Sequence, residues 1–186
     1  MNNKLIGRKP VLLSSLWLLL ISLNSICLAE TRHSESDMEP IAARSLEKDV
    51  RIEVEELHQF FVDWFNGKAD QSVFDEFTSR FDSKVHYIGP GGALLDQTAL
   101  TGFLAGARGI ASDFRIAIRD VKVLHQSDSH IIATYTEWQR HAVFSDRPES
   151  GRRTTVVLSK SKPFRWLHIH ETWLPEEIYK AGPYDF

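Results

Sequence analysis

Apolar residues recur at helical spacing in the segment that follows residue 45. Five of them are separated by steps of four and three residues, which places them on one face of a helix: Val50, Val54, Leu57, Phe61 and Trp64. Ser45 is a suitable N-cap, and Gly67 is a suitable stop. The pattern predicts a long amphipathic helix from Leu46 to about residue 66.

Two shorter helices are predicted after it. Asp70 can cap a helix whose inward residues are Val73, Phe74, Phe77 and Phe81. A brief strand over 84–88 leads to the glycine-rich cluster 89–92, which requires a turn. A third helix is predicted to start near Asp96, and its apolar side is formed by three residues: Leu100, Phe103 and Leu104.

The period of the pattern changes from about 3.6 to 2 after Gly109. Alternating residues predict four long strands, over 114–125, 129–144, 152–160 and 164–173. Three helices followed by a meander of strands indicate the α+β class, with the helices packed on one face of a curved antiparallel sheet.

This order of elements resembles the nuclear transport factor 2-like (cystatin-like cone) superfamily, particularly its SnoaL-like branch. Three segments carry the resemblance: the helix with Phe61 and Trp64, the segment 86–92, and the closing strand 166–173. The closing strand is similar to that of the calcium/calmodulin-dependent kinase association domain. The resemblance covers residues 46–175 and implies a cone with an internal cavity. It does not imply one activity, because this fold hosts isomerases, cyclases, dehydratases and assembly domains.

Composition adds little to this prediction. The chain has 186 residues, of which 42% are hydrophobic and 25% are charged, and its formal net charge is −3. These values fit one ordinary globular domain and give no reason to expect nucleic acid as a partner. The single cysteine, Cys27, can form neither an internal disulfide nor a cysteine metal site.

Residues 1–29 have the three parts of a secretory signal peptide. A basic start (Lys4, Arg8, Lys9) precedes an apolar run over 11–23, and Cys27 and Ala29 suit a cleavage site. The alternative is a retained anchor, but the apolar run is short of the roughly 20 residues that span a bilayer. Cleavage would remove three basic residues and take the net charge from −3 to −6. We expect a secreted or periplasmic protein with no membrane contact after cleavage.

The rest of the chain divides into three parts. Residues 30–45 are polar without an apolar period and predict a flexible linker. The cone domain is expected over 46–175, and 176–186 form a C-terminal tail.

Alternation along the closing strand separates its two faces. Leu167, Ile169, Glu171 and Trp173 project to one side, and the aliphatic pair assigns that side to the helices and the cavity. A desolvated Glu171 carboxyl would have a raised pKa and could act as a general acid or base. The alternative is a structural glutamate paired with a nearby arginine.

The opposite side of this strand carries Trp166, His168 and His170. In resembling families this face often pairs with a second subunit, which implies a homodimer through these three residues. Cavity lining is a second interpretation. A metal site is a third, with His86 or His141 as the further ligand, although nothing in the sequence brings either close. We expect no metal and no cofactor.

The strand over 129–144 has polar and aromatic residues on both faces, so its inner face is not decided by the pattern. Glu137 is the second candidate acid or base, and His86 the candidate histidine. His58 lies on the first helix, where a solvated or internally satisfied histidine is the commoner case. The residues expected to bind a ligand are mainly aromatic side chains of the cone: Phe61, Trp64, Tyr87, Tyr135, Trp138 and Trp173.

Three functions remain open at this point. The first is an exported homodimer that binds a small, partly apolar molecule in its cone. The second is an isomerase, cyclase or lyase that uses Glu171 or Glu137. The third is a non-catalytic assembly module. The mechanism of the steroid-isomerase members is disfavoured, because Tyr87 stands near the place of their carboxylate base and the first helix contains no tyrosine.

Overall fold

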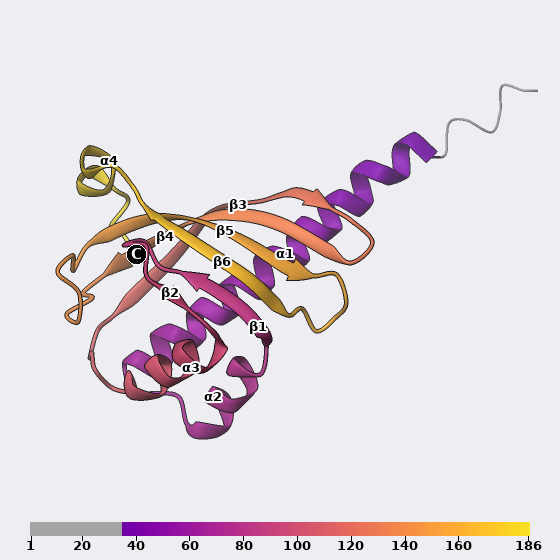
Figure 1. Ribbon diagram of the computed structural model, residues 1–186. Coiled ribbons are helices and arrows are strands. Elements are labelled where there is room, and N and C mark those ends of the chain that lie inside the picture. The colour runs from indigo at the N-terminus through magenta and orange to yellow at the C-terminus, as the bar shows by residue number, and fades with distance from the viewer. Residues whose placement is uncertain (1–34) are drawn as a thin grey trace, which may run out of the picture.

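The computed structural model describes residues 35–186, and their side chains from Ala43 onward. The predicted signal peptide, residues 1–29, lies outside the described residues. The described part is α+β, as predicted: a curved, open six-stranded sheet with helices on its inner side (Figure 1). Along this part of the chain, no helix combines the length and apolar character needed to cross a membrane.

The strands lie in the order β2-β1-β6-β5-β4-β3. β3 (Arg115–Gln126), β4 (His130–Arg140), β5 (Ser150–Ser159) and β6 (Trp166–Trp173) form the antiparallel meander that the alternating pattern predicted. β1 (Phe81–Ile88) pairs with β6 in parallel, and the short β2 (Leu94–Leu95) pairs with β1 in antiparallel. The sheet is therefore mixed, whereas the sequence predicted a wholly antiparallel one.

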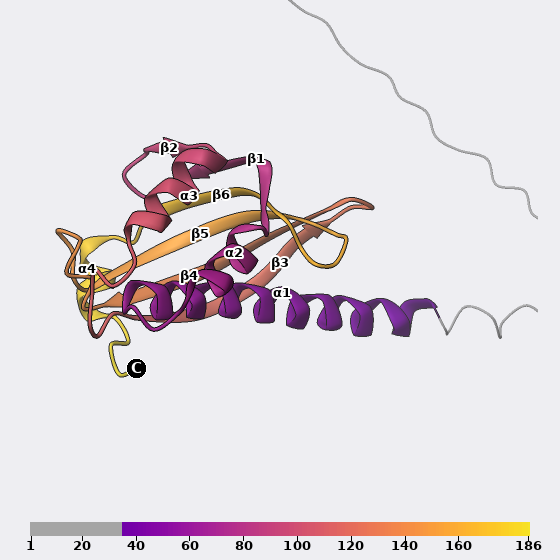
Figure 2. The ribbon, with the colours of Figure 1, turned by 90° about the horizontal axis from the view of Figure 1, so that it is seen from below.

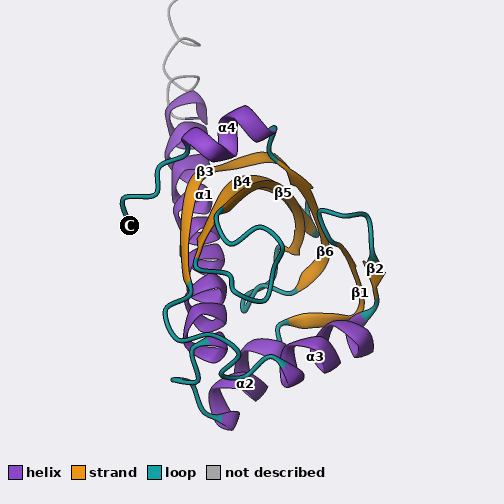
Figure 3. Ribbon diagram, turned by 90° about the vertical axis from the view of Figure 1, so that its left-hand side faces the viewer, coloured by secondary structure: helices purple, strands orange, loops and turns teal. Residues whose placement is uncertain are grey.

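The inner side of the sheet is closed by α1 (Glu35–Phe65), α2 (Gln71–Thr78) and α3 (Gln97–Gly106). Figure 2 shows α1 running along the sheet beside β3, and Figure 3 shows the strands curving around the space that the helices enclose. Asp70 caps α2 by accepting hydrogen bonds from the amides of Ser72 and Val73, and Asp96 caps α3 by accepting one from Ala99. Both caps are the predicted ones.

Two helix boundaries differ from the sequence prediction. α1 begins at Glu35, so residues 35–45 are helical where a flexible linker was expected. A polar segment without an apolar period can extend a helix that packing has already nucleated, because each added residue contributes a hydrogen bond without a new nucleus. α2 ends at Thr78, and Phe81 begins β1 instead of facing inward from the helix.

The core lies between α1 and the inner face of the sheet. Val50, Val54, Leu57 and Trp64 are buried on the predicted face of α1. The Trp64 indole Nε1 donates a hydrogen bond of 2.6 Å to the carbonyl of Leu104, which ties α1 to the end of α3. Trp64 thus belongs to the core.

A second tryptophan is buried near the start of β6. Trp166 is fully buried, and its Nε1 donates a hydrogen bond of 2.8 Å to Glu53 of α1. The same carboxylate accepts a hydrogen bond of 3.1 Å from Arg80. The expectation that Trp166 shares the outer face with His168 is therefore wrong. A register shift between β5 and β6 at this point moves Trp166 to the inner side, because one additional residue reverses the alternation of a strand.

The C-terminal segment covers part of the outer face. After α4 (Glu176–Ala181), the chain passes over β4, where Tyr184 meets the Trp138 ring edge-on at 5.8 Å. Arg140 donates a hydrogen bond of 2.8 Å to the carbonyl of Phe186. A Cβ at Gly182 would lie 2.2 Å from the Trp138 ring, so the close approach requires glycine.

Candidate functional site

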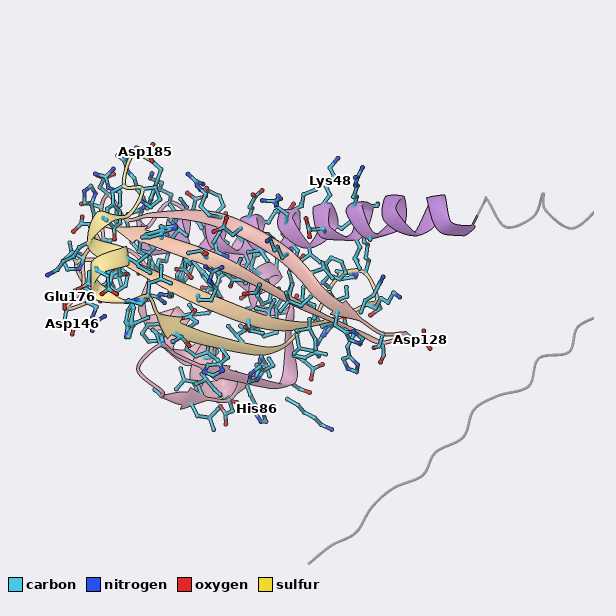
Figure 4. All side chains as sticks on the ribbon, turned by 90° about the horizontal axis from the view of Figure 1, so that it is seen from above. Lys48, His86, Asp128, Asp146, Glu176 and Asp185 are labelled. Carbon is cyan, nitrogen blue, oxygen red and sulfur yellow. The ribbon has the colours of Figure 1, made fainter. Side chains whose placement is uncertain are left out.

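A cavity of about 590 Å³ lies between the helices and the inner face of the sheet. This volume is in the range of small-molecule sites, roughly 300–1,000 Å³. Its walls are mainly apolar and come from α1, α3 and β3, with Phe61, Phe65, Leu100 and Ile116 among them. The mouth is bordered by the glycine-rich turn after β1 and by the loop after β4, which carries Asp146. Figure 4 shows Asp146 at the same end of the molecule as Glu176, away from the hairpin tip at Asp128.

Apart from Ser145 and Asp146 at the mouth, the polar residues of the cavity are gathered on its floor, where β4, β5 and β6 run side by side. Alternation along β4 directs Tyr135, Glu137 and Gln139 inward, which settles the inner face that the sequence left open. Arg152 of β5 stands directly opposite Glu137 in the antiparallel ladder. Glu171 lies on β6, the next strand, two residues before Trp173, which is the ladder partner of Arg152.

Arg152 joins these side chains into one network. Its Nη1 donates a hydrogen bond of 2.8 Å to Glu171 Oε2, and its Nη2 donates one of 2.9 Å to Gln139 Oε1. Gln139 Nε2 in turn donates to Glu137 Oε1 at 2.6 Å. The Tyr87 hydroxyl donates to Glu171 Oε2 at 3.1 Å. A guanidinium thus stands between two carboxyl groups, in direct contact with one and linked to the other through an amide.

His58 of α1 approaches the same network from behind the floor. Its Nδ1 lies 2.6 Å from the carbonyl oxygen of Val54 and must carry a hydrogen, because a carbonyl only accepts. Its Nε2 lies 3.3 Å from Glu137 Oε2 and 3.4 Å from the Tyr135 hydroxyl. Two bare acceptors would repel each other, so a close contact between Nε2 and Oε2 is favourable only when a proton lies between them.

The two carboxyl groups of the floor are shifted in opposite directions. Burial by itself would raise the pKa of Glu137, but the Arg152 charge and the His58 contact outweigh it and lower this pKa to about 2. Burial raises the pKa of Glu171, and the Glu137 charge adds to this effect, although Arg152 opposes it. Burial also raises the pKa of Tyr87, which keeps its proton for Glu171. Two carboxyl groups with divergent pKa values can serve as a base and an acid.

The structure brings together several of the residues that the sequence singled out. Five of them line the cavity: Phe61, Tyr87, Glu137, Glu171 and Trp173. Tyr135 is buried beneath the floor, beside His58.

Three of the predicted site residues lie elsewhere. Trp138 projects from β4 to the outer face, where the C-terminal segment covers it, so it is no cavity wall. Trp64 packs in the core. His86 is exposed on β1 and is the ladder partner of His168, so it is remote from the carboxyl groups.

Three residues of the network were not predicted as site residues: His58, Gln139 and Arg152. Gln139 follows Glu137 by two positions and shares its face, so alternation includes it once the face is known. Arg152 is the arginine that the structural interpretation of Glu171 required, but no spacing in the sequence identifies it. His58 reaches Glu137 over 79 positions of chain, and only the packing of α1 on the sheet brings them together.

The outer face carries the two histidines of β6. The rings of His168 and His170 lie edge to face with 6.2 Å between their centres. Burial lowers the pKa of His168, and the neighbouring His170 and His86 add to this shift. Within the part of the chain that the structure describes, no three histidine, cysteine or acidic side chains are arranged to hold a metal ion.

Comparison with known proteins identifies the fold. No family model matches the chain, and neither does any curated protein. Among solved structures, an NTF-2 like protein of unknown function from Pseudomonas aeruginosa is 27% identical, with a TM-score of 0.63 over 68% of this chain and 99% of that chain.

Two further structures are more distant. An uncharacterised protein with a cystatin-like fold from Caulobacter vibrioides is 14% identical, with a TM-score of 0.51 over 70% of this chain and 93% of that one. The CaMKII hub of S. rosetta is 19% identical, with a TM-score of 0.54 over 68% and 95%. The chain has the nuclear transport factor 2-like fold, as the resemblance in its sequence indicated.

Proposed function

We propose that this nuclear transport factor 2-like chain is an exported protein that binds a small, partly apolar molecule in its cone and associates with a second copy of itself. The signal-peptide pattern of residues 1–29 supports export. The cavity supports binding, and the outer face of the sheet supports association.

The observation that carries the binding function is the division of the cavity into apolar walls and a polar floor. Phe61, Phe65 and Leu100 provide apolar contact area, and the hydrogen-bonding groups of the floor belong to the network around Arg152. Binding sites for small molecules combine a mostly apolar surface with a few convergent polar groups in this way. A core built for stability alone would fill this volume with side chains.

Blocking the mouth of the cavity should abolish binding. Ala93 lines the cavity and is exposed, so an Ala93→Trp substitution adds bulk at the mouth without disturbing the core. We expect the neutral dye Prodan to bind the wild-type protein with a blue shift of its emission, and the variant to bind it at least tenfold more weakly. Fluorescence titration measures both affinities.

Ala105→Trp is the matched control, because Ala105 is exposed on α3 and does not line the cavity. Equal dye affinity for the wild type and both variants would contradict binding in the cone.

The middle of the outer face supports association. Ile132, Val157 and His168 are only half-buried there, and they stand next to one another across β4, β5 and β6. A contiguous surface of aliphatic and imidazole groups suits an interface better than it suits water. The name of the S. rosetta structure describes a hub, which supports self-association in this fold. The proposed interface contains His168 and His170 and excludes Trp166.

A charge in the centre of this surface should prevent association. Val157→Glu would place a carboxylate against its own copy, and we expect sedimentation velocity at about 100 µM protein to change from a dimer to a monomer. Ile178→Glu makes the same change on the exposed side of α4 and should leave the dimer intact. A monomeric wild-type protein at this concentration would refute the interface.

A further inference from the structure

The charge of the cavity lining indicates what kind of molecule it accepts. Among the described residues that line it, three are acidic and one is basic: Glu137, Asp146, Glu171 and Arg152. Arg152 is held by Glu171 and Gln139, so its charge is directed along the floor. Its Nε has no hydrogen-bond partner in the described structure. The net charge of the residues that line the cavity is therefore negative.

One carboxylate oxygen on the floor has no donor. The Glu171 side chain is 7% exposed, and its Oε2 accepts both hydrogen bonds that the described residues donate to this carboxyl, from Tyr87 and Arg152. Oε1 receives none. No described residue donates to Oε1, so a ligand in the cavity can supply its donor. Both oxygens of Glu137, in contrast, have partners already, Gln139 and His58.

The walls suit the same kind of ligand. Phe61, Phe65 and Tyr87 border the cavity, and the faces of such rings attract cations. The chain already uses this interaction nearby, because the Arg152 and Arg147 guanidinium groups lie 5.0 Å and 4.8 Å from the centre of the Trp173 ring. An anionic ligand would instead meet the two carboxyl groups of the floor.

From the unpaired Oε1, the acidic lining and the aromatic walls, we infer that the cone binds a small organic cation, an ammonium group on an apolar or aromatic body. The ammonium donates a hydrogen bond to Glu171 Oε1, and the body packs against Phe61 and Phe65. This inference rests on the proposed binding function and specifies its ligand class. A charge-assisted hydrogen bond is about twice as strong as a neutral one, which makes the charge of the ligand measurable.

Three probes of nearly equal size test the inference: 2-phenylethylammonium, 2-phenylethanol and phenylacetate. Isothermal titration calorimetry at pH 7 should rank the ammonium about tenfold tighter than the alcohol, and phenylacetate weakest. Glu171→Gln keeps the shape and the acceptor but removes the charge. We expect it to weaken the binding of the ammonium about tenfold and to change the affinity for the alcohol less than threefold.

Glu55→Gln is the matched control, because it makes the same change at an exposed position of α1 and should leave all three affinities unchanged. The outcomes separate the two proposals. If phenylacetate or the alcohol binds tightest, the cation inference is wrong and binding in the cone stands. If the ammonium binds tightest but Glu171→Gln has no effect, the assigned contact is wrong. If no probe binds, both proposals fail.

A second variant, Asp146→Asn, tests the acidic mouth without touching the buried network. It should weaken the binding of the ammonium probe only.

Discussion

Arg152→Met should lower the free energy of unfolding by about 3–5 kcal/mol, the cost typical of removing one partner from a buried ion pair. The substitution keeps most of the side-chain volume but removes the one cationic contact that the described residues make with Glu171, and the donor to Gln139. Glu137 and Glu171 would then share a buried floor without the charge that compensates them. Equilibrium unfolding in urea, followed by tryptophan fluorescence, measures the loss.

Two further variants separate this cause from a general loss of packing. Arg153→Met changes the neighbouring residue, which is exposed on the outer face, and should alter the free energy of unfolding by less than about 0.5 kcal/mol. Adding Glu171→Gln to Arg152→Met should recover more than half of the loss, because it removes one of the two uncompensated charges. If the double variant is no more stable than Arg152→Met alone, the repulsion argument is wrong.

The polar floor is difficult to explain by stability alone. Buried ion pairs are often no more stabilising than well-packed apolar residues of similar volume, since desolvation offsets most of the attraction. In this chain the pair of Arg152 and Glu171 also borders a cavity, so both groups are desolvated without filling the space beside them. The proposed ligand would complete the network and give these residues a role beyond folding.

Local rules predicted much of the fold. The steps of four and three residues identified the buried face of α1, and the capping aspartates Asp70 and Asp96 marked two helix starts correctly. The change of period after Gly109 located the four-stranded meander. Alternation along β6 placed Glu171 on the cavity side, because a strand buried on one side constrains its parity.

The remainder of the site depends on events that local rules do not contain. The register shift at the start of β6 turned Trp166 inward. Trp138 is buried on the outer face by Tyr184, a residue 46 positions further along the chain, so burial and polarity did not distinguish the two faces of β4. The contact of His58 with Glu137 requires α1 to cross the sheet at one particular place. Each of these features depends on residues that are far apart in the sequence, so no local sequence pattern indicates it.

The opposite pKa shifts of the two carboxyl groups predict opposite pH dependences of stability. The pKa of Glu137 is lowered by folding, from about 4.5 to about 2, so the folded state favours its ionised form. Its contribution of about 3 kcal/mol to the free energy of unfolding is present above pH 4.5 and is lost as the pH falls toward 2. The pKa of Glu171 is raised by folding, so its contribution is present below about pH 4.5 and is lost as the pH rises through its folded pKa.

Glu137→Gln and Glu171→Gln should therefore respond to pH on different sides of about 4.5, and each serves as the control for the other. The difference in unfolding free energy between Glu137→Gln and the wild type should be largest near pH 6 and shrink toward pH 2, because acid protonates the wild-type carboxylate and removes its advantage. Glu171→Gln should approach or exceed wild-type stability as the pH rises above 4.5, since the amide avoids the cost of a buried, ionised carboxylate. Urea unfolding at pH intervals from 2 to 8 measures both curves. Parallel curves for the two variants would contradict the opposite pKa shifts of the two carboxyl groups, and with them the division of the floor that the network around Arg152 creates.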